Sequence, residues 1–139
     1  MKPTKSVTCE AWQLLVKFFF TQRADLPTLA SEFELSPTQC HVLHLIEPDR
    51  PIPMSRLAEA LACDASNVTG LVDRLEARGL VRRQPSAGDR RVKVLELTSA
   101  GARLRSTVFD RMTKPPESLE RLSADEQRIL VKILKRLLD

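Results

Sequence analysis

The residues with the clearest chemical use are basic and small polar side chains between positions 64 and 93. These 30 residues hold seven basic and four acidic side chains, whereas the rest of the chain holds 15 basic and 14 acidic ones. Most of the net charge of +4 therefore lies in this segment. A concentrated basic segment is typical of a surface that binds a polyanion, although a solvated charged surface would have the same composition.

Small residues occupy one side of a helix that we expect in this segment. Its apolar positions have the helical spacing i, i+3, i+4 and i+7, namely Val68, Leu71, Val72 and Leu75. The residues that face outward near its start are Ala65, Ser66, Asn67, Thr69 and Gly70. Short side chains allow a helix to approach base edges in DNA, and Arg74 could reach a phosphate or be held by an acidic partner. Helix capping and surface polarity are the alternative for the polar residues.

A second candidate site is the charged turn Asp89-Arg90-Arg91. An arginine presented at a loop tip can enter the minor groove of DNA, where the potential is strongly negative. Asp89 is suited to hold one guanidinium in place. An exposed ion pair without function is the alternative, because such pairs are common and weak.

The elements expected around these residues form a winged helix. A short helix at about 54–61, a turn at 62–64 and a longer helix capped by Asp64 or Ser66 make a helix-turn-helix. Gly79 stands where the longer helix should end. Strands at 80–84 and 90–97 follow and predict a β-hairpin.

The hairpin has apolar residues on both faces, at Val94 and Leu95. We expect one face to pack on the helices and the other to be only partly covered.

Further helices are expected on both sides of the winged helix. A first helix begins at Ser6 or Thr8, and Pro27 ends it or starts a connector. A second runs from Ser36-Pro37 to about Glu47, followed by a connector with an extended residue at Ile52. Two more helices follow Thr98, separated by Pro115-Pro116, and the last covers 124–138.

The fold class is therefore mostly α-helical with a small β-hairpin wing, in one domain over residues 1–139. The winged-helix region is expected at 34–98, and dimerisation helices at 6–26 and 99–139. The pairs Ile133-Leu134 and Leu137-Leu138 are too apolar for a helix left in water, which favours a homodimer. Packing on the first helix within one chain is the alternative.

Several motifs resemble the MarR family of bacterial winged-helix regulators. They are Leu57-Ala58, Asn67-Val68-Thr69, Val72-Asp73-Arg74-Leu75-Glu76, Gly79-Leu80-Val81, Asp89-Arg90-Arg91 and Leu97-Thr98-x-x-Gly101. The resemblance implies a homodimer that binds an inverted-repeat operator in double-stranded DNA. It also implies base-reading positions at Ser66, Asn67, Thr69 and Gly70, a backbone contact at Arg74, and a wing-tip Arg91 braced by Asp89. Gly70 departs from the longer side chains of some members.

Members of this family often release DNA when a small amphipathic acid or phenol binds. The candidate pocket residues here are Trp12, Phe19, His41 and His44, although aromatic residues at helical spacing are more often part of a core.

The cysteines raise two further possibilities, oxidant sensing and metal binding. Cys9 resembles the oxidant-sensing cysteine of the hydroperoxide repressors of the family, but the chain has no tyrosine to activate a thiol as in that subgroup. Cys40 and His44 are spaced i, i+4, yet two ligands do not make a metal site. Cys9, Cys40 and Cys63 are widely spaced, and we expect three reduced thiols, no metal and no cofactor.

Other function classes find little support in the sequence. It contains no glycine-rich phosphate loop, nucleophile elbow or metalloprotease motif, so we expect no enzyme. No apolar stretch could span a membrane, and Met1 to Thr8 lacks the apolar run of a signal peptide, which predicts a cytoplasmic protein. We therefore expect a DNA-binding transcriptional repressor released by a small molecule. An oxidant-sensing repressor that uses Cys9 and a winged helix for protein contact are the alternatives.

Overall fold

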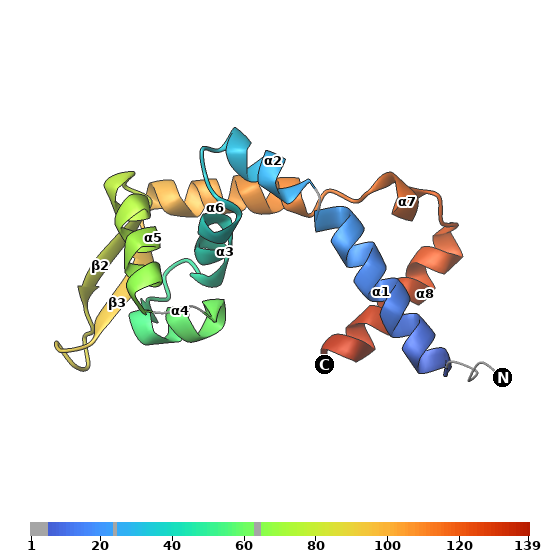
Figure 1. Ribbon diagram of the computed structural model, residues 1–139, viewed down its shortest axis with the longest axis horizontal. Coiled ribbons are helices and arrows are strands. Elements are labelled where there is room, and N and C mark those ends of the chain that lie inside the picture. The colour runs from blue at the N-terminus through green and yellow to red at the C-terminus, as the bar shows by residue number, and fades with distance from the viewer. Residues whose placement is uncertain (1–5, 24, 63–64) are drawn as a thin grey trace.

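The chain forms a winged-helix body and a separate helical arm. The computed structural model describes residues 6–23, 25–62 and 65–139. In Figure 1 a long helix, α6 (Ser99–Met112), runs along the body from the hairpin side to α2, and the arm lies beyond its C-terminal end. The arm consists of α1 (Val7–Arg23) and α8 (Ala124–Leu138), which overlap in this view, and the short α7 (Glu117–Glu120). Both α1 and α8 lie at the end of the molecule away from the wing.

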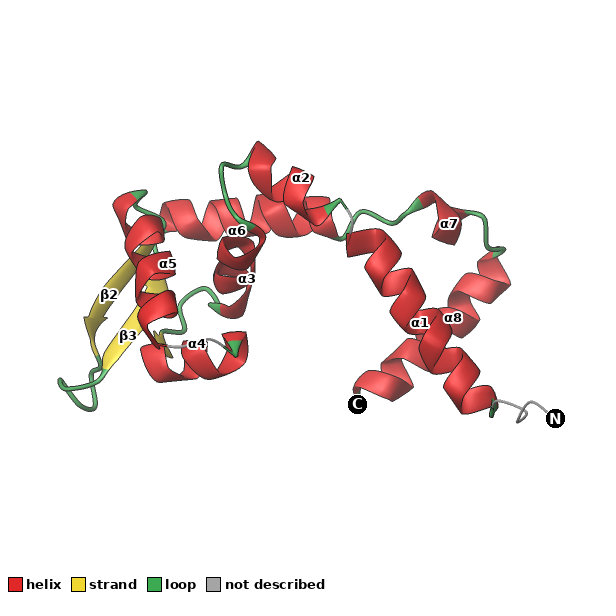
Figure 2. Cartoon of the chain, viewed as in Figure 1, coloured by secondary structure: helices red, strands yellow, loops and turns green. Residues whose placement is uncertain are grey.

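The body is mostly helical with a small antiparallel sheet, as the sequence predicts (Figure 2). Its elements in chain order, before α6, are α2 (Leu26–Glu32), α3 (Pro37–Leu45), β1 (Ile52–Pro53), α4 (Met54–Leu61), α5 (Ala65–Ala77), β2 (Val81–Pro85) and β3 (Lys93–Leu97). The sheet order is β1-β3-β2, so the extended residue expected at Ile52 forms an edge strand beside the hairpin. The turn between α4 and α5, with Cys63 and the candidate cap Asp64, lies outside the described residues.

The core of the body is built where α3, α4 and α5 meet the sheet. Leu43, Leu57, Val72, Leu75 and Leu95 are each at most 1% exposed. The apolar positions predicted for α5 supply three of its buried residues, Val68, Val72 and Leu75, and Leu71 packs at its edge. Burial of this stripe fixes which side of α5 faces outward.

Local capping signals place several helix ends where the sequence predicts them. Ser36 and Gln39 form a reciprocal capping box at the start of α3, with bonds of 3.1 and 2.8 Å. Ser6 accepts from the amide of Cys9 at the start of α1. Thr98 caps α6 through the amide of Gly101. Gly79 follows α5 with φ of 68°, a backbone conformation that glycine adopts without strain.

One expectation about the elements is wrong, and one short helix was not predicted. Pro27 lies in the first turn of α2, where a missing amide costs nothing, rather than in a connector. The short α7 was also not expected, because four residues show no readable period.

The two faces of the hairpin are covered to different extents. Leu95 is 0% exposed and faces the core. On the opposite face Val94 is 7% exposed and is flanked by its cross-strand neighbours Gln84 and Pro53. Gln84 and Glu96 on that face are half-buried and Arg82 is exposed, so the expectation of a partly covered second face is confirmed.

Candidate nucleic-acid interface

The outward side of α5 carries the small residues that the sequence predicts. Val68 and Val72 are buried beneath the helix, whereas Ser66, Asn67, Thr69 and Gly70 are exposed. A β-carbon added at Gly70 would meet nothing within 4 Å, so the helix surface is open there. This side of α5 can approach a flat or grooved partner closely, because no long side chain projects from its first turns.

The wing presents its arginines on a turn stabilised by backbone hydrogen bonds. The amide of Ser86 donates to Val92 O at 2.8 Å, and the amide of Val92 donates to Asp89 O at 3.0 Å. Asp89 Oδ1 accepts from the amide of Arg91 at 3.0 Å. Asp89 therefore braces the backbone of Arg91. Within the described wing its carboxylate forms no ion pair with Arg90 or Arg91, so the expected guanidinium brace is wrong in this conformation. A side chain two residues back reaches the amide more readily than the end of a long arginine.

Three arginines of the basic segment are held by the protein itself. Arg83 pairs with Asp73 at 2.5 Å and with Glu76 at 2.9 Å, and its amide also donates to Glu76. Arg82 pairs with Glu96 across the hairpin. Arg78 donates to the carbonyls of Glu34 and Phe33, at 2.8 and 3.1 Å. These arginines orient α5 and the strands, and the ion pairs partly neutralise the charges of Arg82 and Arg83.

Arg83 is the main residue of the site that sequence reasoning missed. It lies on β2 and joins the strand to Asp73 and Glu76 on α5. The guanidinium holds the pKa of the Glu76 carboxyl below its ordinary value, chiefly through their hydrogen bond. Arg83 thus pairs with the Asp73 carboxylate, which is next to Arg74 in the sequence. Because ten residues separate Asp73 from Arg83, no local pattern in the sequence indicates this pair.

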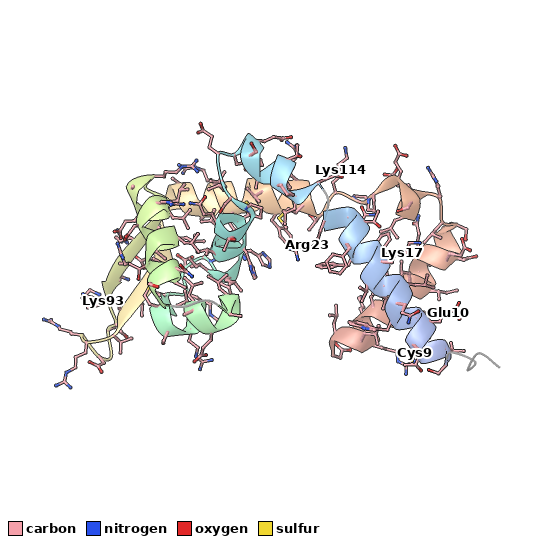
Figure 3. All side chains as sticks on the ribbon, viewed as in Figure 1. Cys9, Glu10, Lys17, Arg23, Lys93 and Lys114 are labelled. Carbon is pink, nitrogen blue, oxygen red and sulfur yellow. The ribbon has the colours of Figure 1, made fainter. Side chains whose placement is uncertain are left out.

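The remaining basic side chains of the 64–93 segment are exposed and have no carboxylate partner in the described part of the chain: Arg74, Arg90, Arg91 and Lys93. Arg56 on α4, outside this segment, is exposed and without a carboxylate partner in the same way. Arg74 is therefore not held by an acidic partner there, which was one of its two expected roles. Arg56 and Lys93 were not among the predicted site residues. Figure 3 shows Lys93 at the wing, next to the extended side chains of the hairpin tip.

The four candidate effector residues are not brought together in one chain. Trp12 and Phe19 are 66% and 54% exposed on α1, in the arm. His41 and His44 lie on α3, in the body, and both are exposed. His44 stacks on Phe109 of α6 with ring centroids 5.6 Å apart, beside a hollow of only about 10 Å³. That volume has room for about one water molecule. The assignment of these four residues to an effector pocket therefore stays a prediction.

The two described cysteines differ in exposure. Cys9 is exposed, and Figure 3 places it at the outer end of α1, far from the wing. Cys40 is 3% exposed, and burial raises the pKa of its thiol. No three histidine, cysteine or carboxylate side chains gather to hold a metal ion within residues 6–23, 25–62 and 65–139. Over the same ranges, no helix is both long and apolar enough to cross a lipid bilayer.

Comparisons with known proteins agree on one family. The sequence pattern of the MarR family matches residues 35–93, which include α5, β2 and the tip of the wing. The HTH-type transcriptional repressor NicR of Pseudomonas putida is 31% identical over 134 residues, which cover 96% of this chain and 85% of NicR. The HTH-type transcriptional regulator YfiV of Bacillus subtilis is 31% identical over 94% of this chain and 84% of its own length.

Solved structures are similar over nearly the whole chain. Wild-type MarR of Escherichia coli in its apo form has a TM-score of 0.77 at 26% identity, over 91% of this chain and 95% of that one. A mutant of the same protein complexed with operator DNA has a TM-score of 0.63 at 26% identity, over 91% of this chain and 92% of that one. The similarity therefore covers both the winged-helix body and much of the arm.

Proposed function

Since this chain belongs to the MarR family of transcriptional regulators, we propose that it is a homodimeric repressor that a small molecule releases from operator DNA. Membership of this family also agrees with the expectation that the chain is not an enzyme. The observation that carries the proposal is the surface formed by α5 and the wing. There a helix face of small polar residues lies beside arginines that no carboxylate of the described residues neutralises.

In this proposal, α5 enters the major groove and the wing enters the adjacent minor groove. Ser66, Asn67 and Thr69 read base edges, and the open surface at Gly70 lets the helix backbone come close. Arg91 enters the minor groove, with its backbone held by Asp89. The exposed basic residues Arg56, Arg74, Arg90 and Lys93 contact phosphates, which position the protein without reading sequence.

The arm supports the dimer in this proposal. Neither α1 nor α8 has a buried residue in the single chain. Large apolar side chains of these two helices are exposed to solvent, with Trp12 66% and Leu138 86% exposed. A patch of this kind on the two terminal helices is covered when the same helices of a second copy pack against it. The resulting two-fold axis would present two α5 helices about 34 Å apart and so favour an inverted repeat.

The repressor and effector parts of the proposal both depend on the dimer proposed above. A dimer bound across a promoter occludes it, and NicR is named a repressor. A ligand that binds better to a dimer with differently spaced α5 helices would draw the population off DNA. A small amphipathic acid or phenol is the class of effector that we propose, with a pocket completed by the second copy.

The test is selection of duplex DNA from a random pool by the purified protein, followed by binding of the selected duplex over a salt series. We expect an inverted repeat with half-sites one helical turn apart and a steep salt dependence. Arg91→Ala should weaken binding by roughly 1–3 kcal/mol and lower the salt slope by about 1. Arg50→Ala removes the same charge from the turn after α3, where Arg50 pairs with Glu47, and should bind like the wild type.

Two results would overturn the proposal. A pool that yields no motif would favour a winged helix used for protein contact. An enriched motif that Arg91→Ala binds as tightly as the wild type and Arg50→Ala do would remove the wing from the interface.

A further inference from the structure

The turn between β3 and α6 is bonded directly to the end of α5. The Thr98 hydroxyl donates to the carbonyl of Gly79 at 2.6 Å and accepts from the amide of Gly101 at 3.0 Å. The amide of Thr98 donates to Leu80 O at 3.1 Å. The first turn of α6 thus holds the residues that terminate α5. We call residues 98–101 the Thr98–Gly101 turn.

Gly101 lets two segments of backbone meet without a side chain between them. It is buried, and a β-carbon at this position would lie 1.8 Å from Leu80 O and 2.8 Å from the Leu80 carbonyl carbon. Backbone atoms cannot rotate away as the end of a flexible side chain can. Any larger residue must therefore change the position of α6 relative to the end of α5.

The helix that begins at this turn connects the body to the arm. Arg105, about one turn past Gly101 on α6, donates to the carbonyls of Leu43 and His44 at the end of α3, both at 3.1 Å. Beyond that contact α6 still packs on the body, through buried Val108 and the ion pair of Arg111 with Glu32 of α2, and then leads to the arm (Figure 1). A helix of 14 residues is about 21 Å long, so a rotation of about 10° at one end moves the other by roughly 3–4 Å. That displacement is about one base-pair step of DNA.

We propose that the Thr98–Gly101 turn sets the angle between the dimer arm and α5 and thereby determines the half-site spacing that the regulator accepts. Thr98 and Gly101 are positioning residues in this proposal, because they touch the end of α5 and not DNA. The proposal rests on the proposed function, since a spacing requirement exists only for a dimer on a two-part operator.

The experiment measures binding to a panel of duplexes in which the selected half-sites are moved apart or together by one and two base pairs. Thr98→Val removes the hydroxyl but keeps the shape, and Thr98→Ser keeps the hydroxyl. Gly101→Ala adds the methyl group against Leu80, and Ser99→Ala changes an exposed residue in the same turn of α6. Circular dichroism and sedimentation establish that each variant is folded and has the wild-type oligomeric state.

We expect the preferred spacing of Thr98→Val and Gly101→Ala to shift or broaden by about one base pair, because a rotation of about 10° at this turn would displace the arm by roughly that distance. Thr98→Ser and Ser99→Ala should keep the wild-type profile. If Gly101→Ala does not fold, the two Thr98 variants decide. A uniform loss of affinity with an unchanged spacing profile would overturn the inference and leave the proposed function intact. A wild-type protein that selects no duplex, or binds all spacings equally, would overturn both.

Discussion

Replacing Arg83 by methionine should weaken the attachment of the wing to α5 without creating a cavity. The change removes ion pairs with Asp73 and Glu76, at 2.5 and 2.9 Å, but keeps the backbone bond from residue 83 to Glu76. The Arg83 and Glu76 side chains are 30% and 38% exposed, so solvent screens both pairs. Two pairs of this kind contribute about 0.2–1 kcal/mol each. The freed carboxylates, three residues apart on one helix, repel by a further few tenths of a kcal/mol.

The expected loss is therefore about 1–2 kcal/mol, or a decrease of roughly 3–8 °C in the unfolding midpoint for a chain of this size. Thermal unfolding followed by circular dichroism measures it, at one fixed protomer concentration because dimerisation also stabilises. Arg50→Met is the matched control. Arg50 makes one ion pair with Glu47 at 78% exposure, and its loss should leave the midpoint unchanged.

A double-mutant cycle of Arg83→Met with Glu76→Gln isolates the interaction between the two side chains. We expect a coupling energy of about 0.5–1 kcal/mol for this pair. A coupling of zero, together with an Arg83→Met midpoint equal to that of Arg50→Met, would refute the role of Arg83 as the connection between β2 and α5.

Three further predictions follow from the cysteines, the carboxylates and the arm. Iodoacetamide should modify Cys9 rapidly and Cys40 only on unfolding, because burial protects Cys40 and raises its pKa; equal rates by peptide mass spectrometry would contradict this. The pKa of Glu76 is lowered in the folded state, so its stabilisation is present at neutral pH and is lost as the pH falls below the usual carboxyl range. Glu76→Gln should flatten the pH dependence of the unfolding midpoint there, and an unchanged profile would refute the assignment. Leu137→Glu should shift sedimentation toward the monomer, because it places a charge on the apolar arm, and an intact dimer would exclude this part of α8 from the interface.

Features that depend on neighbouring residues were predictable from the sequence. The start of α3 at Ser36-Pro37, the cap of α6 at Thr98 and the end of α5 at Gly79 all rest on bonds within a few residues. The outward positions of Ser66 and Asn67 followed from the helical period of the buried residues. The motifs indicate the family from the sequence alone, because the charged turn and the Leu-Thr-x-x-Gly run have a specific order.

Short elements and exposed turns were less predictable. A proline such as Pro27 is tolerated both in a connector and in the first turn of a helix. Only packing against α3 and α6 decided that α2 is helical. Asp89 was expected to hold a guanidinium, but the geometry of the turn brings the amide of Arg91 to it instead.

The sequence by itself therefore determined the order of the longer elements, several helix ends and the outward side of α5, because these depend on the chain's local hydrogen bonds and hydrophobic period. Only the tertiary structure decided which arginines are neutralised and which remain available to a polyanion, since Arg83 meets its carboxylates across two elements. It also decided why Gly101 must be a glycine, because the carbonyl it approaches belongs to Leu80, 21 residues earlier in the chain. Contacts of this kind depend on how elements pack, and no local spacing in the sequence encodes them.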